Sequence, residues 1–232
     1  MRSHLLTLAT ALAATVLSAQ DIMPGFRGVQ EGEVFVVFEE SVTNGTKTGT
    51  VTENHVDKID LEKKTLTYTI SITSGAPGAE AETESLPPQE ISMLPYVMPD
   101  AQKGAPAPEA PKTDTVEVTI RAMDGTDVKL TCMHGKSEMS GTTSEFWYST
   151  DKREEEIKRG EGKIKVHAVY SKTVTDSPPP AEGLAGSRTV VESWTAPDDL
   201  PTFSAVLWQH MVMTGGYGDV ETTTKLVEIR KP

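Results

Sequence analysis

Apolar and polar residues alternate along much of this 232-residue chain, and a period of two is typical of β-strands. The alternation is clearest over residues 115–132, where every second residue is apolar on both sides of the dipeptide Asp124-Gly125. A dipeptide of this kind favours a tight turn between two antiparallel strands, as does Asn44-Gly45 near the N-terminal end. The sequence therefore predicts β-hairpins at both places.

The same pattern extends over most of the chain and predicts a mainly β fold with little helix. We expect an antiparallel, curled sheet, either a half-barrel or an open barrel. Residues 151–158 are the exception, because Asp151 followed by Glu154 resembles a helix capping box. The predicted strands lie within residues 31–43, 48–56, 65–73, 115–132, 144–149, 163–174, 189–195 and 223–229.

Residues 203–213 are apolar and fit two structures. Apolar residues at helical spacing, including Phe203 and Leu207, are compatible with one face of a helix. A Gly-rich segment and a further strand follow, and this order favours a strand. We therefore predict a strand and keep the helix as the alternative.

The first residues have the three parts of a secretory signal peptide. A positively charged start precedes an apolar stretch from Leu5 to Leu17, and small residues up to Ala19 follow. That stretch is shorter than the roughly 20 residues that a membrane-spanning helix needs. We expect a signal peptide over 1–19, a single β-rich domain over 20–232, no stable membrane insertion, and a periplasmic or secreted location.

Residues 74–113 interrupt the strand pattern. They are rich in Pro, Ala, Gly and Glu, a composition that buries too little apolar area to offset the entropy lost on ordering. We predict a flexible insert in the domain. The apolar residues 91–98 within it are expected either to pack across the sheet or to form a mobile flap over a cavity.

Charge and cysteine content exclude some functions. The formal net charge of −12 makes binding to nucleic acid unfavourable at long range. The single cysteine, Cys132, excludes an intramolecular disulfide, and its place on the apolar side of a strand predicts an unreactive thiol.

Motifs for catalysis or for a cofactor are weak. No Gly-x-Ser-x-Gly motif is present, and the Gly-rich residues 215–218 have no following helix or lysine to hold a phosphate. Two soft-ligand groups, 132–134 with Met139 and 210–213, would suit copper(I). Adjacent strand residues point to opposite faces, so neither group is expected to converge on a metal ion. Because the sequence also lacks a catalytic or phosphate-binding motif, we predict no metal site, no cofactor and no enzymatic activity.

Aromatic residues give the better indication of a binding function. Trp147, Trp194 and Trp208 all lie in predicted strands, and Met211 follows the third. Large aromatic residues are mostly buried, which makes a core role the simplest interpretation. On the hollow face of a curled sheet they would instead contact an apolar ligand. We take these four residues as the candidate ligand-binding set.

Residues 192–201, Glu-Ser-Trp-Thr-Ala-Pro-Asp-Asp-Leu-Pro, carry a family resemblance. A strand that ends in Trp and leads through such a turn to a final strand pair resembles the C-terminal part of uncharacterised exported bacterial β-rich proteins. Some of these are similar to the LolA/LolB half-barrel, an antiparallel sheet curled around an apolar cavity that holds an acyl chain. The resemblance implies a half-barrel and a lipid-like ligand, and it assigns no binding residue.

The sequence thus predicts an exported protein that holds an apolar or lipid-like ligand on the hollow face of a β-sheet. The first alternative is a structural or interaction protein of the cell envelope that binds another envelope protein and has no ligand pocket. The second alternative is a secreted hydrolase, which requires polar side chains converging in a cleft.

Overall fold

The computed structural model describes residues 22–75, 80–95, 112–179, 185–215 and 218–232. The predicted signal peptide, residues 1–19, lies outside the described residues and stays a prediction. Within the described part, no helix has the length and apolar character needed to cross a membrane.

The described chain consists of strands and two 3-10 turns, η1 (Pro24–Phe26) and η2 (Thr202–Ser204). The strands are β1 Val34–Thr43, β2 Thr46–Asp60, β3 Thr65–Gly75, β4 Glu82–Ser85, β5 Gln89–Ser92, β6 Thr113–Arg121, β7 Asp127–Met139, β8 Thr142–Ser149, β9 Arg153–Arg159, β10 Gly162–Ser177, β11 Ser187–Thr195, β12 Val206–Gly215 and β13 Val220–Arg230.

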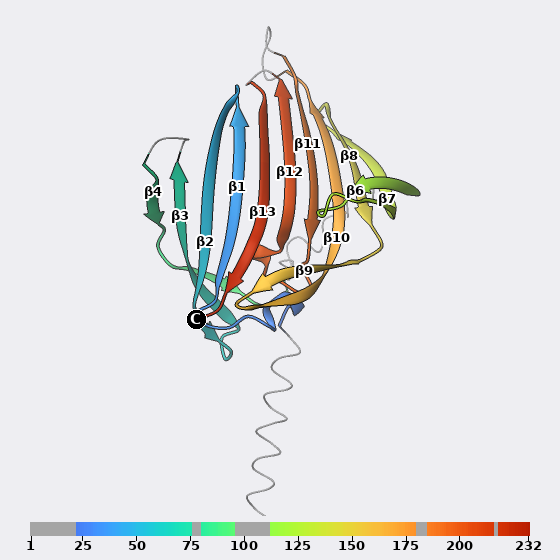
Figure 1. The fold of residues 1–232 in the computed structure, drawn as a ribbon. Coiled ribbons are helices and arrows are strands. Elements are labelled where there is room, and N and C mark those ends of the chain that lie inside the picture. The colour runs from blue at the N-terminus through green and yellow to red at the C-terminus, as the bar shows by residue number, and fades with distance from the viewer. Residues whose placement is uncertain (1–21, 76–79, 96–111, 180–184, 216–217) are drawn as a thin grey trace, which may run out of the picture.

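All of these strands form one 13-stranded sheet (Figure 1). Its order is β4-β3-β2-β1-β13-β12-β11-β10-β8-β7-β6, with β5 paired to β3 and β9 paired to β10. Every pairing is antiparallel except a single parallel contact between β13 and β9. The prediction of a mainly β, antiparallel fold is confirmed. The strand predicted over residues 203–213 is confirmed from Val206 onwards, whereas Thr202–Ser204 forms η2.

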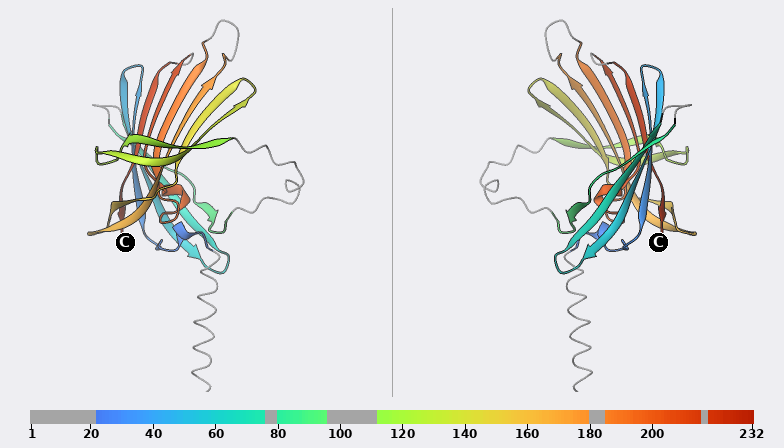
Figure 2. Two further views of the ribbon diagram at one scale, coloured as in Figure 1. Left: turned by 90° about the vertical axis from the view of Figure 1, so that its right-hand side faces the viewer. Right: turned by 90° about the vertical axis from the view of Figure 1, so that its left-hand side faces the viewer.

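The sheet curls without closing into a barrel. The hairpin of β6 and β7 turns across the other strands (Figure 2), and β9 reaches β13, where Arg159 pairs with Ile229. The two ends of the strand order, β4 and β6, do not pair with each other in the described part of the chain. The result is an open, partly ring-like sheet.

Tight turns fix the register of the hairpins. Asn44 and Gly45 both have positive φ values, 50° and 78°, which is the two-residue geometry that joins β1 to β2. The turn between β7 and β8 uses Ser140 and Gly141 in the same way, at 52° and 79°. The Asn-Gly hairpin is confirmed, and Ser-Gly acts as an equivalent turn.

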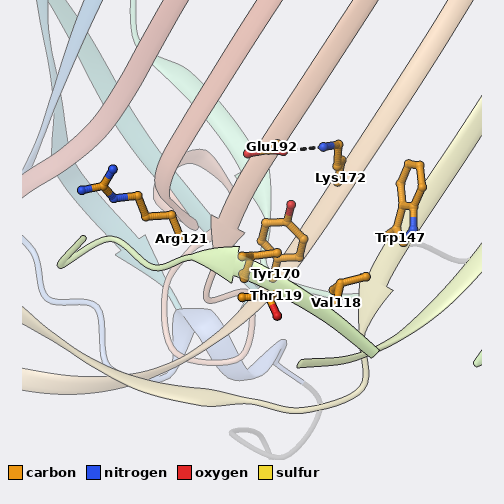
Figure 3. Close-up of a pocket in the computed structure, with 8 residues that line it drawn as sticks. Val118, Thr119, Arg121, Trp147, Tyr170, Lys172 and Glu192 are labelled. Carbon is orange, nitrogen blue, oxygen red and sulfur yellow. Dashed lines mark ion pairs between the residues drawn. The ribbon is translucent and has the colours of Figure 1, made fainter. Parts of the chain in front are cut away.

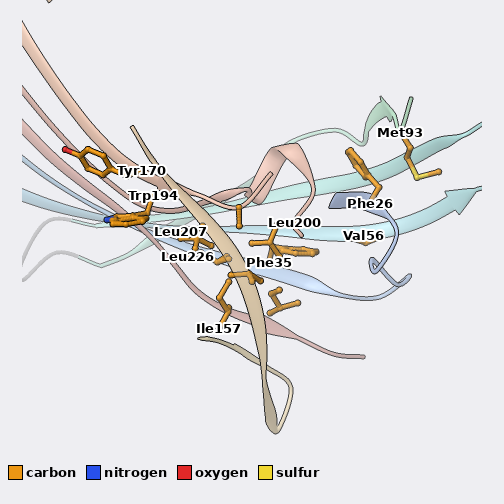
Figure 4. Close-up of a cluster of buried hydrophobic side chains, with 14 of the residues drawn as sticks. Phe26, Phe35, Val56, Met93, Ile157, Tyr170, Trp194, Leu200, Leu207 and Leu226 are labelled. Carbon is orange, nitrogen blue, oxygen red and sulfur yellow. The ribbon is translucent and has the colours of Figure 1, made fainter. Parts of the chain in front are cut away.

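The hydrophobic core gathers near one end of the long strands (Figure 4). Phe203 of η2 stacks on Tyr68 with 4.6 Å between ring centroids and contacts Phe35 edge-on at 5.4 Å. Residues 196–201, the turn in the family resemblance, close this end, since Ala196 and Leu200 are fully buried. Most of the side-chain packing therefore lies at the η2 end.

The helix predicted for residues 151–158 is wrong, because strand β9 begins at Arg153 and takes up the rest of this segment. Its residues alternate between exposed and buried positions, and Ile157 is buried in the core. Glu154 of the predicted capping box instead forms a cross-strand ion pair with Lys165 at 2.6 Å, and Glu156 forms another with Lys163 at 2.8 Å.

The expectation of an unstructured insert over 74–113 needs correction for its described residues. β4 and β5 lie within it and both pair with β3. Met93 is fully buried, its N–H donates to the Lys64 carbonyl, and its own carbonyl accepts from Met23. Residues 91–95 therefore pack onto the sheet, while residues 76–79 and 96–111 lie outside the described part.

Candidate functional site

Five neighbouring strands place a row of aromatic and charged residues on one face of the sheet. The strand register aligns His134 of β7, Trp147 of β8, Lys172 of β10, Glu192 of β11 and His210 of β12. Directly paired residues share a face, and successive residues along a strand point to opposite faces. We call this side the inner face.

Strand β6 crosses the inner face and encloses a cleft against it (Figure 3). One part, of about 390 Å³, lies beside Trp147 and Tyr170. A neighbouring part, of about 350 Å³, lies beside Trp208 and Met123. Both parts are lined by Arg121 and Glu192. We call the two parts together the β6 cleft.

Charged groups lie at the middle of the β6 cleft. Lys172 Nζ lies 2.7 Å from Glu192 Oε1, and both side chains are about one-third exposed. The same Nζ lies 5.8 Å from the ring centroid of Trp147, within reach of a cation–π contact. Arg121 Nε donates to the Gly125 carbonyl at 3.2 Å. A polar ligand group would meet both signs of charge here.

An apolar wall completes the cleft. Val118 and Ile120 of β6 line the same part of the cleft as Tyr170. Burial, together with the Glu192 carboxylate, raises the pKa of the Tyr170 hydroxyl, so this group stays neutral. The cleft therefore combines an apolar surface with a small number of polar groups, as ligand sites usually do.

A histidine–glutamate pair supports the Trp147 ring. His134 stacks on Trp147 with 4.8 Å between centroids, and its Nε2 lies 2.7 Å from Glu145 Oε1. This hydrogen bond, assisted by Lys136, holds the pKa of Glu145 below its usual range. His134 thus belongs to a network that fixes the orientation of the indole.

The structure separates the four residues predicted to bind ligand. Trp147 and Trp208 line the two parts of the β6 cleft. Trp194 lies on the same face but is 0% exposed, and it packs on Tyr170 with 5.5 Å between centroids. Met211 is three residues from Trp208 on the same strand, so it lies on the opposite face. Placing Met211 with the tryptophans was therefore wrong.

The residues weighed for metal binding are dispersed as well. Cys132 is fully buried, and burial raises the pKa of its thiol. Met133 lies on the other face, and His134 is hydrogen-bonded to Glu145. Within the described ranges, no group of three or more His, Cys, Asp or Glu side chains is arranged to hold a metal ion.

Sequence reasoning missed the polar half of the cleft. Lys172 and Glu192 are 20 residues apart in the chain, and only the register of β10 with β11 brings them together. Arg121 ends a strand that is distant from both in the sheet order. Alternation along a single strand carries no information about such pairings, so no signal in the sequence identified these residues.

No protein-family model matches the chain, and no curated protein matches it in sequence. Two solved structures are similar over most of their length. One is a predicted exported protein with a YmcC-like fold from Bacteroides fragilis, at 14% identity, with 87% of this chain and 97% of the other covered and a TM-score of 0.34.

The other is a predicted lipoprotein from Parabacteroides distasonis, at 11% identity, with 86% of this chain and 95% of the other covered and a TM-score of 0.34. At these values the two similarities support no statement about function. Neither neighbour is described as a LolA or LolB protein, so that part of the resemblance stays a prediction.

Proposed function

We propose that this chain is an exported binding protein that holds a small, lipid-like ligand in the β6 cleft, without catalysing a reaction. Trp147 and Trp208, which lie at its two parts, would contact the apolar portion of the ligand. Arg121 and the Lys172–Glu192 pair would contact its polar group.

One observation carries this proposal: two half-buried tryptophans and an ion pair that is about one-third exposed line the same cleft between β6 and the sheet. A tryptophan whose only role is packing is normally enclosed, as Trp194 is. Trp147 and Trp208 instead leave part of their surface open beside empty volume. Ligand-binding sites commonly combine such apolar walls with a few polar groups.

Export is proposed from the sequence of the first 19 residues. We expect the mature protein to begin near Gln20, because the small residues up to Ala19 precede a typical cleavage position. N-terminal sequencing of the protein recovered from the extracytoplasmic fraction measures this directly. An intact Met1 on protein found in the cytoplasm would contradict export and leave the β6 cleft unaffected.

Dodecanoate, which has an apolar chain and a carboxylate, tests the ligand proposal by isothermal titration calorimetry. We expect saturable binding of one molecule per chain, weakened about tenfold or more by Trp147→Ala, because the variant removes a large apolar contact. Mass spectrometry of the native protein would show whether a lipid-like molecule accompanies it.

Tyr148→Ala is the matched control, because Tyr148 is the next residue on β8 and lies on the opposite face. This variant should bind dodecanoate as the wild type does. Equal weakening by both variants would contradict the location of the site. Absence of both dodecanoate binding and a co-purifying ligand would overturn the proposal and favour an envelope interaction protein without a pocket.

A further inference from the structure

The side of the sheet opposite the β6 cleft is an ordered array of hydroxyl-bearing and apolar side chains. Three residues from each of seven adjacent strands make up this array, which we call the outer face. They are Ser144, Phe146 and Tyr148 on β8; Ser171, Thr173 and Thr175 on β10; Thr189, Val191 and Ser193 on β11; Gln209, Met211 and Met213 on β12; Val220, Thr222 and Thr224 on β13; Glu39, Ser41 and Thr43 on β1; and Thr46, Thr48 and Thr50 on β2.

The outer face differs sharply from the inner face in charge. Only Glu39 among its 21 residues carries a charge. The two inner-face rows on the same seven strands contain 14 residues, of which six are charged: Glu40, Lys47, Glu145, Lys172, Glu192 and Glu221. In a chain with a net charge of −12, a large surface with one carboxylate is unusual. Depletion of charge is characteristic of the centres of protein interfaces.

Within the described part of the chain, η2 covers this side of the sheet only at the core end, where Phe203 contacts Phe35 four residues before Glu39 on β1, and the array beyond it is not enclosed. Every residue of the array except Ser193 is at least partly exposed. Several hydroxyls bond to each other along the surface, as Ser41 does with Thr222 at 3.3 Å and Ser171 with Ser193 at 2.8 Å. Hydroxyls that are already paired cost less to remove from water than unpaired ones. The array is thus suited to burial against a partner.

The size and charge of the outer face fit a second copy of this chain, and we propose that two copies dimerise through it. Strand spacing and residue rise give the array dimensions of about 34 Å by 20 Å, or roughly 700 Å², close to the ~800 Å² per partner of a standard interface. Repulsion between two acidic chains is weakest where carboxylates are fewest. The two sheets would pack face to face, as in a β-sandwich.

Met211 stands at the centre of the array. It occupies the middle row of three and lies on β12, the middle strand of the seven. A two-fold axis through the centre would bring Met211 of one copy against Met211 of the other. Its flexible, apolar side chain is suited to fill the space between two sheets. This accounts for an apolar methionine on the face opposite the cleft.

Sedimentation equilibrium of the purified chain, over the low to high micromolar range, tests the dimer with a matched pair of variants. Thr222 and Thr223 are adjacent on β13, of the same residue type and similarly exposed, and they lie on the outer and inner faces respectively. We expect a monomer–dimer equilibrium in the wild type. Thr222→Lys should raise its dissociation constant at least tenfold, whereas Thr223→Lys should change it less than twofold.

Cross-linking gives a second readout. The native thiol of Cys132 is fully buried, so a cysteine introduced by Met211→Cys would be the reactive one. Mild oxidation should link this variant into a disulfide dimer, and the inner-face variant Val212→Cys should stay monomeric. A wild type that sediments as a monomer throughout would overturn the proposal. A dimer that Thr222→Lys leaves intact, or that Thr223→Lys disrupts equally, would do the same.

Discussion

Glu33→Ala is expected to lower the free energy of unfolding by about 3–5 kcal/mol, the range for breaking a buried ion pair. The Glu33 carboxylate is 0% exposed and accepts hydrogen bonds from Arg159 Nε at 2.8 Å and from the Gln30 N–H at 3.0 Å. Without it, the Arg159 guanidinium, which is 17% exposed, loses its anionic partner. Urea unfolding followed by circular dichroism measures the loss.

The neighbouring residue on β9 supplies the control. Lys158 pairs with Glu228, but its side chain is 61% exposed, so Lys158→Ala should cost at most about 1 kcal/mol. The contrast follows from desolvation, because water replaces a lost partner at the surface and cannot do so in the interior. Equal effects of the two variants would show that the pair of Glu33 and Arg159 is not buried in solution.

Trp194→Ala is expected to cost about 3–5 kcal/mol, because the fully buried indole would leave a cavity in the core. Trp194→Phe should cost only about 1–2 kcal/mol. The reason is that the indole Nε1 is buried without a hydrogen-bond partner among the described residues, so phenylalanine removes no bond. Thermal and urea unfolding of both variants measure these differences.

Trp208 pairs directly with Trp194 across the strands and serves as the control. Because its ring is only partly buried, Trp208→Ala should destabilise the protein clearly less than Trp194→Ala, while weakening dodecanoate binding. A loss of binding by Trp194→Phe at full stability would contradict the purely structural role of Trp194. It would return this residue to the ligand site.

The strands could be predicted from the sequence because apolar residues occupy every second position of a half-buried strand. The hairpin over 115–132 shows this pattern directly. The same reasoning failed at 151–158, where Asp151 and Glu154 fit a helix capping box, although Glu154 and Glu156 lie on the exposed, charged side of a strand. Their partners, Lys165 and Lys163, come after the turn, and only the pairing with β10 distinguishes the two structures.

Only part of the candidate site could be predicted, because residue type can be read from the sequence but the register between strands cannot. Trp147 and Trp208 were chosen for residue type, and the fold places both at the cleft. Met211 was chosen with them, although it is three residues from Trp208. Residues at that spacing lie on opposite faces of a strand and share a face only on a helix. Lys172 and Glu192 depend on the register between strands, which local sequence does not encode.

The pairing of β1 with β13 has a consequence for how the chain folds. Val34, near the start of the described residues, pairs with Arg230, two residues before the last. The hairpins of β1 with β2 and of β12 with β13 can form locally, but the ladder between them requires closing a loop of almost the whole chain.

For a chain that emerges N-terminus first, one edge of β1 therefore keeps its backbone groups unpaired until the last strand arrives. Such an open edge is a template for pairing with another chain. The period before β13 is complete is thus when unfinished copies are most exposed to aggregation.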